Sequence, residues 1–139
     1  MTRPLMCWVL LLSMTVVVAP GCRNTEPAPM KEVQRVRAGG LDVVVLSPTG
    51  TLQQGRATFA LEFRGADGQL IDAGTVSVNA TMPMAGMAPM FGESTVASST
   101  TTGRYEVSSD LNMAGNWRLG IEWNGPAGRG STSIAGTVR

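Results

Sequence analysis

Four methionines lie within nine residues of this chain, in the segment 82–90, which reads MPMAGMAPM. A thioether sulfur is a soft, uncharged ligand that suits Cu(I), and it has no proton to lose when it binds a metal. The prolines and the glycine inside the segment prevent a regular helix or strand from continuing through it. The chain contains no histidine, so the commonest protein ligand for Zn(II) and Cu(II) is missing. The segment is therefore the best candidate for a metal site built from side chains.

Three of these methionines recur at every third position. Met84, Met87 and Met90 could supply three soft ligands to one Cu(I) or Ag(I) ion, and we expect them to form the site. Met82 continues an inward-facing strand pattern and Met113 precedes a later strand, so either could assist. The alternative is that these side chains plug one end of the fold or form an apolar contact surface for another protein.

The first 21 residues have the pattern of a signal peptide. Arg3 supplies a positive start, and the apolar run from Leu5 to Ala19 is too short for a comfortable membrane span. The run ends in APGC at positions 19–22, which resembles the lipobox of bacterial lipoproteins. We therefore expect cleavage before Cys22 and a lipid on Cys22. The protein would then be anchored in a membrane of the bacterial cell envelope, facing the periplasm or the exterior. Ordinary cleavage nearby and an uncleaved N-terminal anchor are the alternatives.

The remainder of the chain divides into a linker and one domain. Residues 22–40 lack aromatic side chains and contain two prolines and two glycines, so we expect a lipidated flexible linker. One turn of helix over residues 30–37 would be compatible with this linker. Residues 41–139 are sufficient for a single domain with one hydrophobic core.

Composition argues against several classes of protein. Without Arg3 the chain has 10 basic and 10 acidic residues (11 − 1 = 10, against 10) and no basic stripe with interleaved aromatics, so nucleic-acid binding has no support. Of the two cysteines, Cys7 lies in the expected signal peptide and Cys22 would carry lipid, which leaves neither a disulfide nor a thiol nucleophile. No Ser–His or Cys–His pair can form without histidine. We therefore do not expect an enzyme.

Residues 41–138 have the alternation of an all-β domain. Phe59, Leu61 and Phe63 alternate with more polar residues, as do Leu119 and Ile121 in a later segment, which predicts strands with one buried face. Seven short strands separated by glycine-rich turns favour an immunoglobulin-like antiparallel β-sandwich, with a small barrel as the alternative. The expected strands cover residues 41–47, 57–64, 76–82, 94–99, 104–109, 116–123 and 131–138. The expected buried residues include Phe59, Leu61, Val76, Val78, Tyr105, Leu119 and Ile121, with Trp117 and Trp123 also assigned to the core.

Four motifs occur in an order that resembles a known family. They are DGQLIDAGTV at 67–76, MPM at 82–84, GRY at 103–105 and MAGNW at 113–117. Together they resemble the YtkA-like domain, which is related to FixH-type proteins, over roughly residues 41–138. The resemblance implies an immunoglobulin-like sandwich and a link to bacterial copper handling and oxidase maturation.

The chain departs from the family pattern at two positions. Gly86 is followed by Met87 where the family often has Gly-His, and Ile71 stands where proline is frequent. Methionine in place of histidine keeps a possible ligand but softens it, which favours Cu(I) over Cu(II). From the residues and the resemblance together we expect a copper chaperone or an accessory to a copper transporter or to oxidase assembly. The competing expectation is a structural or adaptor lipoprotein whose methionine segment contacts another protein.

Overall fold

The computed structural model describes residues 29–139, so the expected signal peptide and Cys22 lie outside the described residues. The described part of the chain forms nine strands. Their bounds are β1 Lys31–Ala38, β2 Leu41–Ser47, β3 Gly55–Arg64, β4 Thr75–Met82, β5 Met90–Gly92, β6 Ser94–Ser98, β7 Arg104–Leu111, β8 Gly115–Gly125 and β9 Gly128–Val138. Within residues 29–139 no helix is long and apolar enough to span a bilayer.

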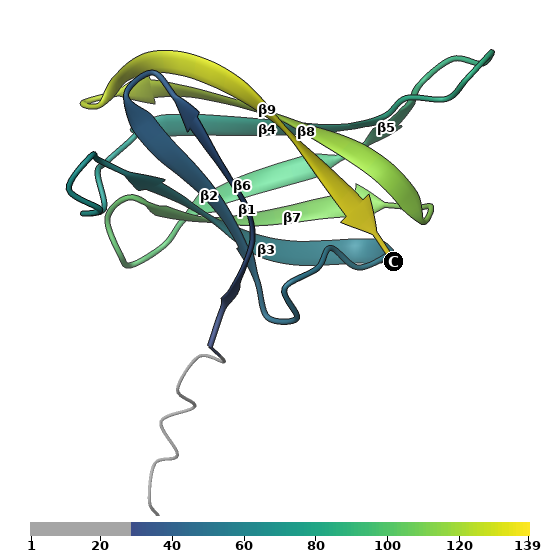
Figure 1. The fold of residues 1–139 in the computed structure, drawn as a ribbon, viewed down its shortest axis with the longest axis horizontal. Coiled ribbons are helices and arrows are strands. Elements are labelled where there is room, and N and C mark those ends of the chain that lie inside the picture. Colours follow the sequence, from purple (N-terminus) through teal and green to yellow (C-terminus); the bar gives the residue numbers. More distant parts are fainter. Residues whose placement is uncertain (1–28) are drawn as a thin grey trace, which may run out of the picture.

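The strands form two sheets that pack face to face (Figure 1). One sheet has the order β1-β2-β3-β7-β6 and the other the order β5-β4-β8-β9, and all of these pairings are antiparallel. The expected antiparallel β-sandwich is thereby confirmed, with nine strands among the described residues instead of about seven, because β1 and β5 were not expected. The alternative of a small closed barrel is wrong, because the strands divide into two separate sheets.

The segment before residue 41 differs from its predicted structure. Residues 31–38 form strand β1, paired with β2 from Lys31 opposite Ser47 to Ala38 opposite Leu41. The prediction of a flexible linker with a helical turn is therefore wrong for this part of residues 22–40. Two glycines at 39 and 40, with φ angles of 59° and 79°, make the two-residue hairpin turn that such a pairing needs. The apolar residues of β1 pack against the core. In the sequence they lie among charged and polar neighbours, so this strand was not recognised.

The core lies between the two sheets and contains most of the residues expected there. Phe59, Leu61, Tyr105, Leu119 and Ile121 are buried, and so are both Trp117 and Trp123. Val76 and Val78 pack against the core but are only half-buried. The reason is that β5 pairs only with residues 80–82 of β4, so the first half of β4 is left at a sheet edge.

The chain changes sheets between β5 and β6, close to the methionine segment. Strand β5 pairs with β4 in one sheet, and β6 pairs with β7 in the other, with Glu93 between them. A Cβ atom on Gly92 would lie 2.4 Å from the carbonyl oxygen of Asp110 and 3.3 Å from Cζ3 of Trp117. Glycine at this position therefore lets the crossing chain press against both the opposite sheet and the Trp117 ring.

Candidate metal site

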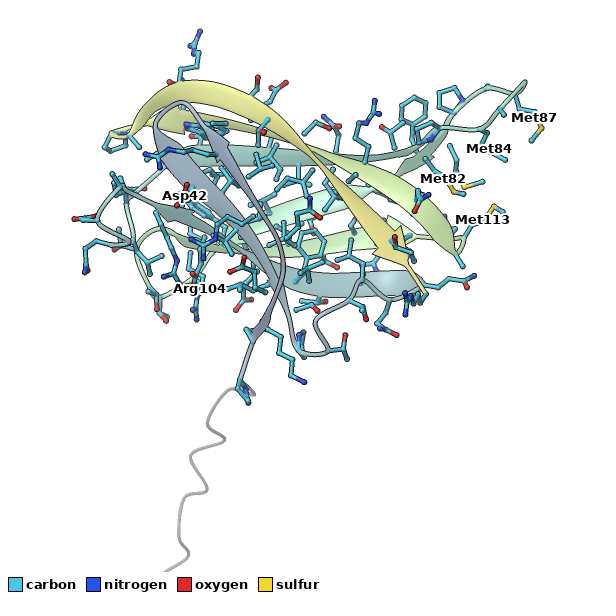
Figure 2. All side chains as sticks on the ribbon, viewed as in Figure 1. Asp42, Met82, Met84, Met87, Arg104 and Met113 are labelled. Atoms are coloured by element: carbon cyan, nitrogen blue, oxygen red, sulfur yellow. The ribbon has the colours of Figure 1, made fainter. Side chains whose placement is uncertain are left out.

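The methionine segment forms the β4–β5 hairpin at one end of the sandwich (Figure 2). Met82 on β4 lies directly opposite Met90 on β5 and forms with it the last pair before the loop at residues 83–89. Side chains directly opposite each other in an antiparallel pair point to the same face, with Cβ atoms about 5 Å apart. Both side chains are half-buried and pack against the core. The hairpin thus places two thioethers side by side at its base.

The loop of the hairpin carries the other two methionines. The backbone N–H of Met87 donates to the carbonyl oxygen of Met84 at 3.4 Å, across a turn in which Gly86 has a φ of 75°. The Met87 side chain is 64% exposed, whereas Met84 is half-buried. Figure 2 shows Met87 far out on the hairpin and Met84 closer to the sandwich. The loop therefore presents one thioether to solvent and keeps the other near the base.

A second turn, between β7 and β8, lies against the base of the hairpin. If Gly115 had a Cβ atom, it would lie 2.6 Å from Cε of Met82, so the end of the Met82 side chain occupies that space. The indole N–H of buried Trp117 donates to the carbonyl oxygen of Met113 at 2.8 Å and holds the turn in place. The Met113 side chain is 40% exposed, at the same end of the molecule as Met82 (Figure 2).

The structure places all five expected ligands at one end of the sandwich, on the β4–β5 hairpin and the β7–β8 turn. Met82, Met90 and the Met113 turn lie at the base of the hairpin, with Met84 above them and Met87 at the exposed tip. The three-residue spacing of Met84, Met87 and Met90 did not show that Met90 faces Met82 across the hairpin. Sequence reasoning also missed the contacts of Gly115 and Trp117, for which the motif MAGNW at 113–117 was the available signal.

The donor set of the hairpin itself is chemically uniform. The segment 82–92 carries no charged residue, and its methionine sulfurs are soft donors. Within the described residues, no three His, Cys, Asp or Glu side chains gather in a way that could hold a metal ion. The hairpin therefore suits a soft monovalent ion, whose binding would release no proton from these ligands.

Phe91 lies next to the methionines but points away from the core. It is 70% exposed, because alternation along β5 turns it outward between half-buried Met90 and Gly92. Together with Met87 it gives the hairpin an exposed apolar surface.

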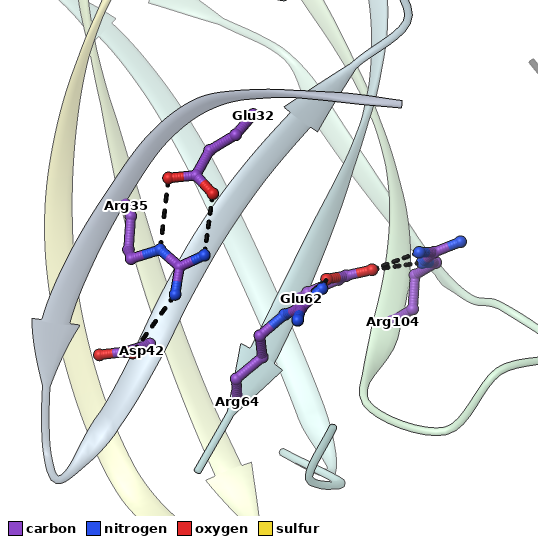
Figure 3. Close-up of polar contacts among 6 residues, drawn as sticks. All are labelled: Glu32, Arg35, Asp42, Glu62, Arg64 and Arg104. Carbon is purple, nitrogen blue, oxygen red and sulfur yellow. Dashed lines mark hydrogen bonds and ion pairs between the residues drawn. The ribbon is translucent and has the colours of Figure 1, made fainter. Parts of the chain in front are cut away.

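The outer face of the five-stranded sheet carries a separate charged cluster, formed by Glu62, Arg64 and Arg104 (Figure 3). Glu62 is fully buried, and each of its carboxylate oxygens accepts hydrogen bonds from one guanidinium group. Burial alone would raise the pKa of Glu62, but the hydrogen bonds and charges of Arg104 and Arg64 outweigh it and hold the pKa below its ordinary value. Because Arg104 lies toward the other end of the sandwich from the methionines, we assign this cluster to stability (Figure 2).

A family model described as YtkA-like matches residues 36–122. The matched region contains the β4–β5 hairpin and the Met113 turn. No curated protein matches the chain.

Proposed function

The chain belongs to the YtkA-like family, and we propose that it is a membrane-tethered, extracytoplasmic lipoprotein that binds Cu(I) or Ag(I). It would act as a copper chaperone, or as an accessory to a copper transporter or to oxidase assembly. The observation that carries this proposal is the meeting of Met82, Met90 and the Met113 turn at the base of one uncharged hairpin.

Burial and pairing favour the methionines at the base of the hairpin over an exposed methionine as ligands of the metal. Met82 and Met90 are paired in register and half-buried, so their side chains lose less freedom on binding a metal than an exposed methionine would. Met113 or Met84 would complete three soft ligands. Met87, exposed at the tip, is accessible to a donor or acceptor of the metal. The bound ion would act as a soft Lewis acid that accepts electron pairs from these sulfurs. The chain would hold it in a site partly screened from water.

The position of β1 bears on the proposed tether. If Cys22 carries the lipid, it lies only nine positions before Lys31, the first residue of β1 (31 − 22 = 9). Nine extended residues span about 30 Å at most. The start of β1 would thus lie within about 30 Å of the membrane surface, which would keep the sandwich close to a membrane-embedded partner.

A Cu(I) titration against a competing chelator tests the metal proposal. The protein should be the full mature chain with Cys22 lipidated or replaced by serine, so that no thiol competes for the metal. We expect the triple variant Met82→Leu, Met90→Leu, Met113→Leu to lose most of its affinity, because leucine keeps the volume but not the sulfur. Each such exchange usually costs under about 1.5 kcal/mol of stability.

Two further variants complete the experiment. The triple variant Met84→Leu, Met87→Leu, Met90→Leu tests the set expected from chain spacing, and comparison of the two triples identifies which methionines bind. Met30→Leu is the matched control, because Met30 is 38% exposed and lies before β1, outside the hairpin. Equal Cu(I) affinity in the wild type and both triple variants would contradict a metal site in this hairpin.

A contact surface for another protein is the second candidate. It is favoured by the exposure of Phe91 and Met87, which form an apolar surface beside the methionine site. On this alternative the wild type does not bind Cu(I), and the leucine variants unfold at nearly the wild-type temperature.

A further inference from the structure

Trp117 contacts both segments that carry the base methionines. Its indole N–H donates to the Met113 carbonyl at 2.8 Å, and its ring lies under Gly92 of β5, two residues after Met90. The side chain is 1% exposed, so the ring is fixed within the core. A single rigid group therefore links the β7–β8 turn to the strand that completes the hairpin.

The Met113 turn is held by two hydrogen bonds from outside itself. Besides the bond from Trp117, the side-chain Nε2 of Gln54 donates to the Asn112 carbonyl at 3.0 Å. These bonds fix the backbone of the turn. Within it, Gly115 has no side chain and so leaves room for the end of the Met82 side chain. Fixing a ligand-bearing turn before the ligand arrives lowers the entropy lost on binding.

We propose that Trp117 is the positioning residue of the methionine site. Through its N–H and its ring it holds Met113 beside Met82 and Met90, without itself contributing a ligand. This inference rests on the proposed function, because it assigns Trp117 a role in the affinity of that site for a soft metal ion. Phenylalanine could fill most of the space, but it has no N–H for the Met113 carbonyl.

The test compares two buried tryptophans. Trp117→Phe keeps an aromatic ring and removes the hydrogen bond to the turn. Trp123→Phe is the matched control, because Trp123 is also buried but packs on Phe63, with ring centroids 5.4 Å apart, away from the turn. We expect Trp117→Phe to weaken Ag(I) binding about three- to tenfold, the factor that one lost hydrogen bond of ordinary strength produces. Trp123→Phe should bind Ag(I) as the wild type does.

A double-mutant cycle separates positioning from general destabilisation. If Trp117 acts by placing Met113, then Met113→Leu should cost less affinity in the Trp117→Phe background than in the wild type. Gln54→Ala tests the same turn from the exposed surface and without a change in the core. We expect it to weaken Ag(I) binding less than Trp117→Phe does, because the indole bond remains.

A readout without metal tests the placement directly. In the protein labelled with ¹³C at the methionine methyls, Trp117→Phe should shift the Met113 and Met82 resonances and leave that of exposed Met87 unchanged.

Ag(I) binding that is as tight in Trp117→Phe and Gln54→Ala as in the wild type would overturn this inference alone. It is also overturned if Trp123→Phe weakens binding as much as Trp117→Phe. Failure of the wild type to bind Ag(I) would overturn the proposed function and this inference together.

Discussion

Replacing Glu62 by glutamine should remove much of the stability that the charged cluster provides. In the native protein one carboxylate oxygen accepts from Nε of Arg104 at 2.8 Å, and the other accepts from Nε of Arg64 at 2.8 Å (Figure 3). The Nη2 atoms of the same two arginines also donate to Glu62. Glutamine keeps one acceptor oxygen and turns the other position into a donor. One guanidinium group would then face an N–H instead of an oxygen, and both would lose their charged partner.

The expected loss follows from the number and burial of these bonds. A hydrogen bond to a charged group contributes about 1.5–3 kcal/mol, and leaving a buried partner unmatched adds to the cost. The arginine side chains are 33% and 37% exposed, so water compensates them in part. We therefore expect Glu62→Gln to lower the free energy of unfolding by about 2 kcal/mol. For a domain of this size, that corresponds to a fall in Tm of about 10 °C.

The effect should depend on pH in a defined direction. The pKa of Glu62 is lowered in the folded protein, whereas in the unfolded chain it takes its ordinary value of 4.5. A lowered pKa means that the stabilisation is complete above the unfolded value and is lost as the pH falls through the folded value. The difference in unfolding free energy between the wild type and Glu62→Gln should therefore be constant near pH 7 and shrink below about pH 4.

Urea unfolding of both proteins between pH 3 and pH 7 measures this difference. Asp110→Asn is the matched control, because its ion pair with Arg56 lies on the same sheet but is exposed, with 70% of the arginine side chain accessible. An exposed pair of this kind contributes about 1 kcal/mol or less. A Glu62→Gln difference as large at pH 3 as at pH 7 would show that the charge of Glu62 is not the cause. Cu(I) affinity should be unchanged, because Arg104 lies away from the methionines (Figure 2).

Three further outcomes follow from the structure and the sequence. Tyr105→Phe should lower the free energy of unfolding by about 1–3 kcal/mol in urea, because the Tyr105 hydroxyl accepts from the buried N–H of Ala73 at 3.1 Å and donates to Asp72 at 3.1 Å. Gly115→Ala should weaken Ag(I) binding measured by competition, since its Cβ would displace the end of Met82 and its φ of 141° is strained for alanine; unchanged affinity would show that the turn does not shape the site. Cys22→Ser should release the protein from the membrane fraction or block its processing, and normal cleavage with continued pelleting would contradict the lipoprotein assignment.

The sequence alone determined the class of fold and the location of the candidate site. Alternation in β3 and β8 identified the strands and the core side chains Phe59, Leu61, Leu119 and Ile121. This was possible because the two-residue period of a strand is a local property, which neighbouring residues record directly. The order of the motifs at 67–76, 82–84, 103–105 and 113–117 indicated the family that the match over residues 36–122 shows.

Tertiary structure decided what depends on partners distant in the chain. From the sequence, strand β1 was interpreted as part of a linker. Its half-buried residues become apparent only once β2 pairs with it. Glu62 lies on the face predicted to be polar, yet it is buried because Arg64 and Arg104 flank it from two strands. The pairing of Met82 with Met90, and the approach of the Met113 turn, follow from strand register and from the Trp117 hydrogen bond. Register and packing are non-local, so the spacing of methionines along the chain could indicate the candidate site but not which methionines lie together at its base.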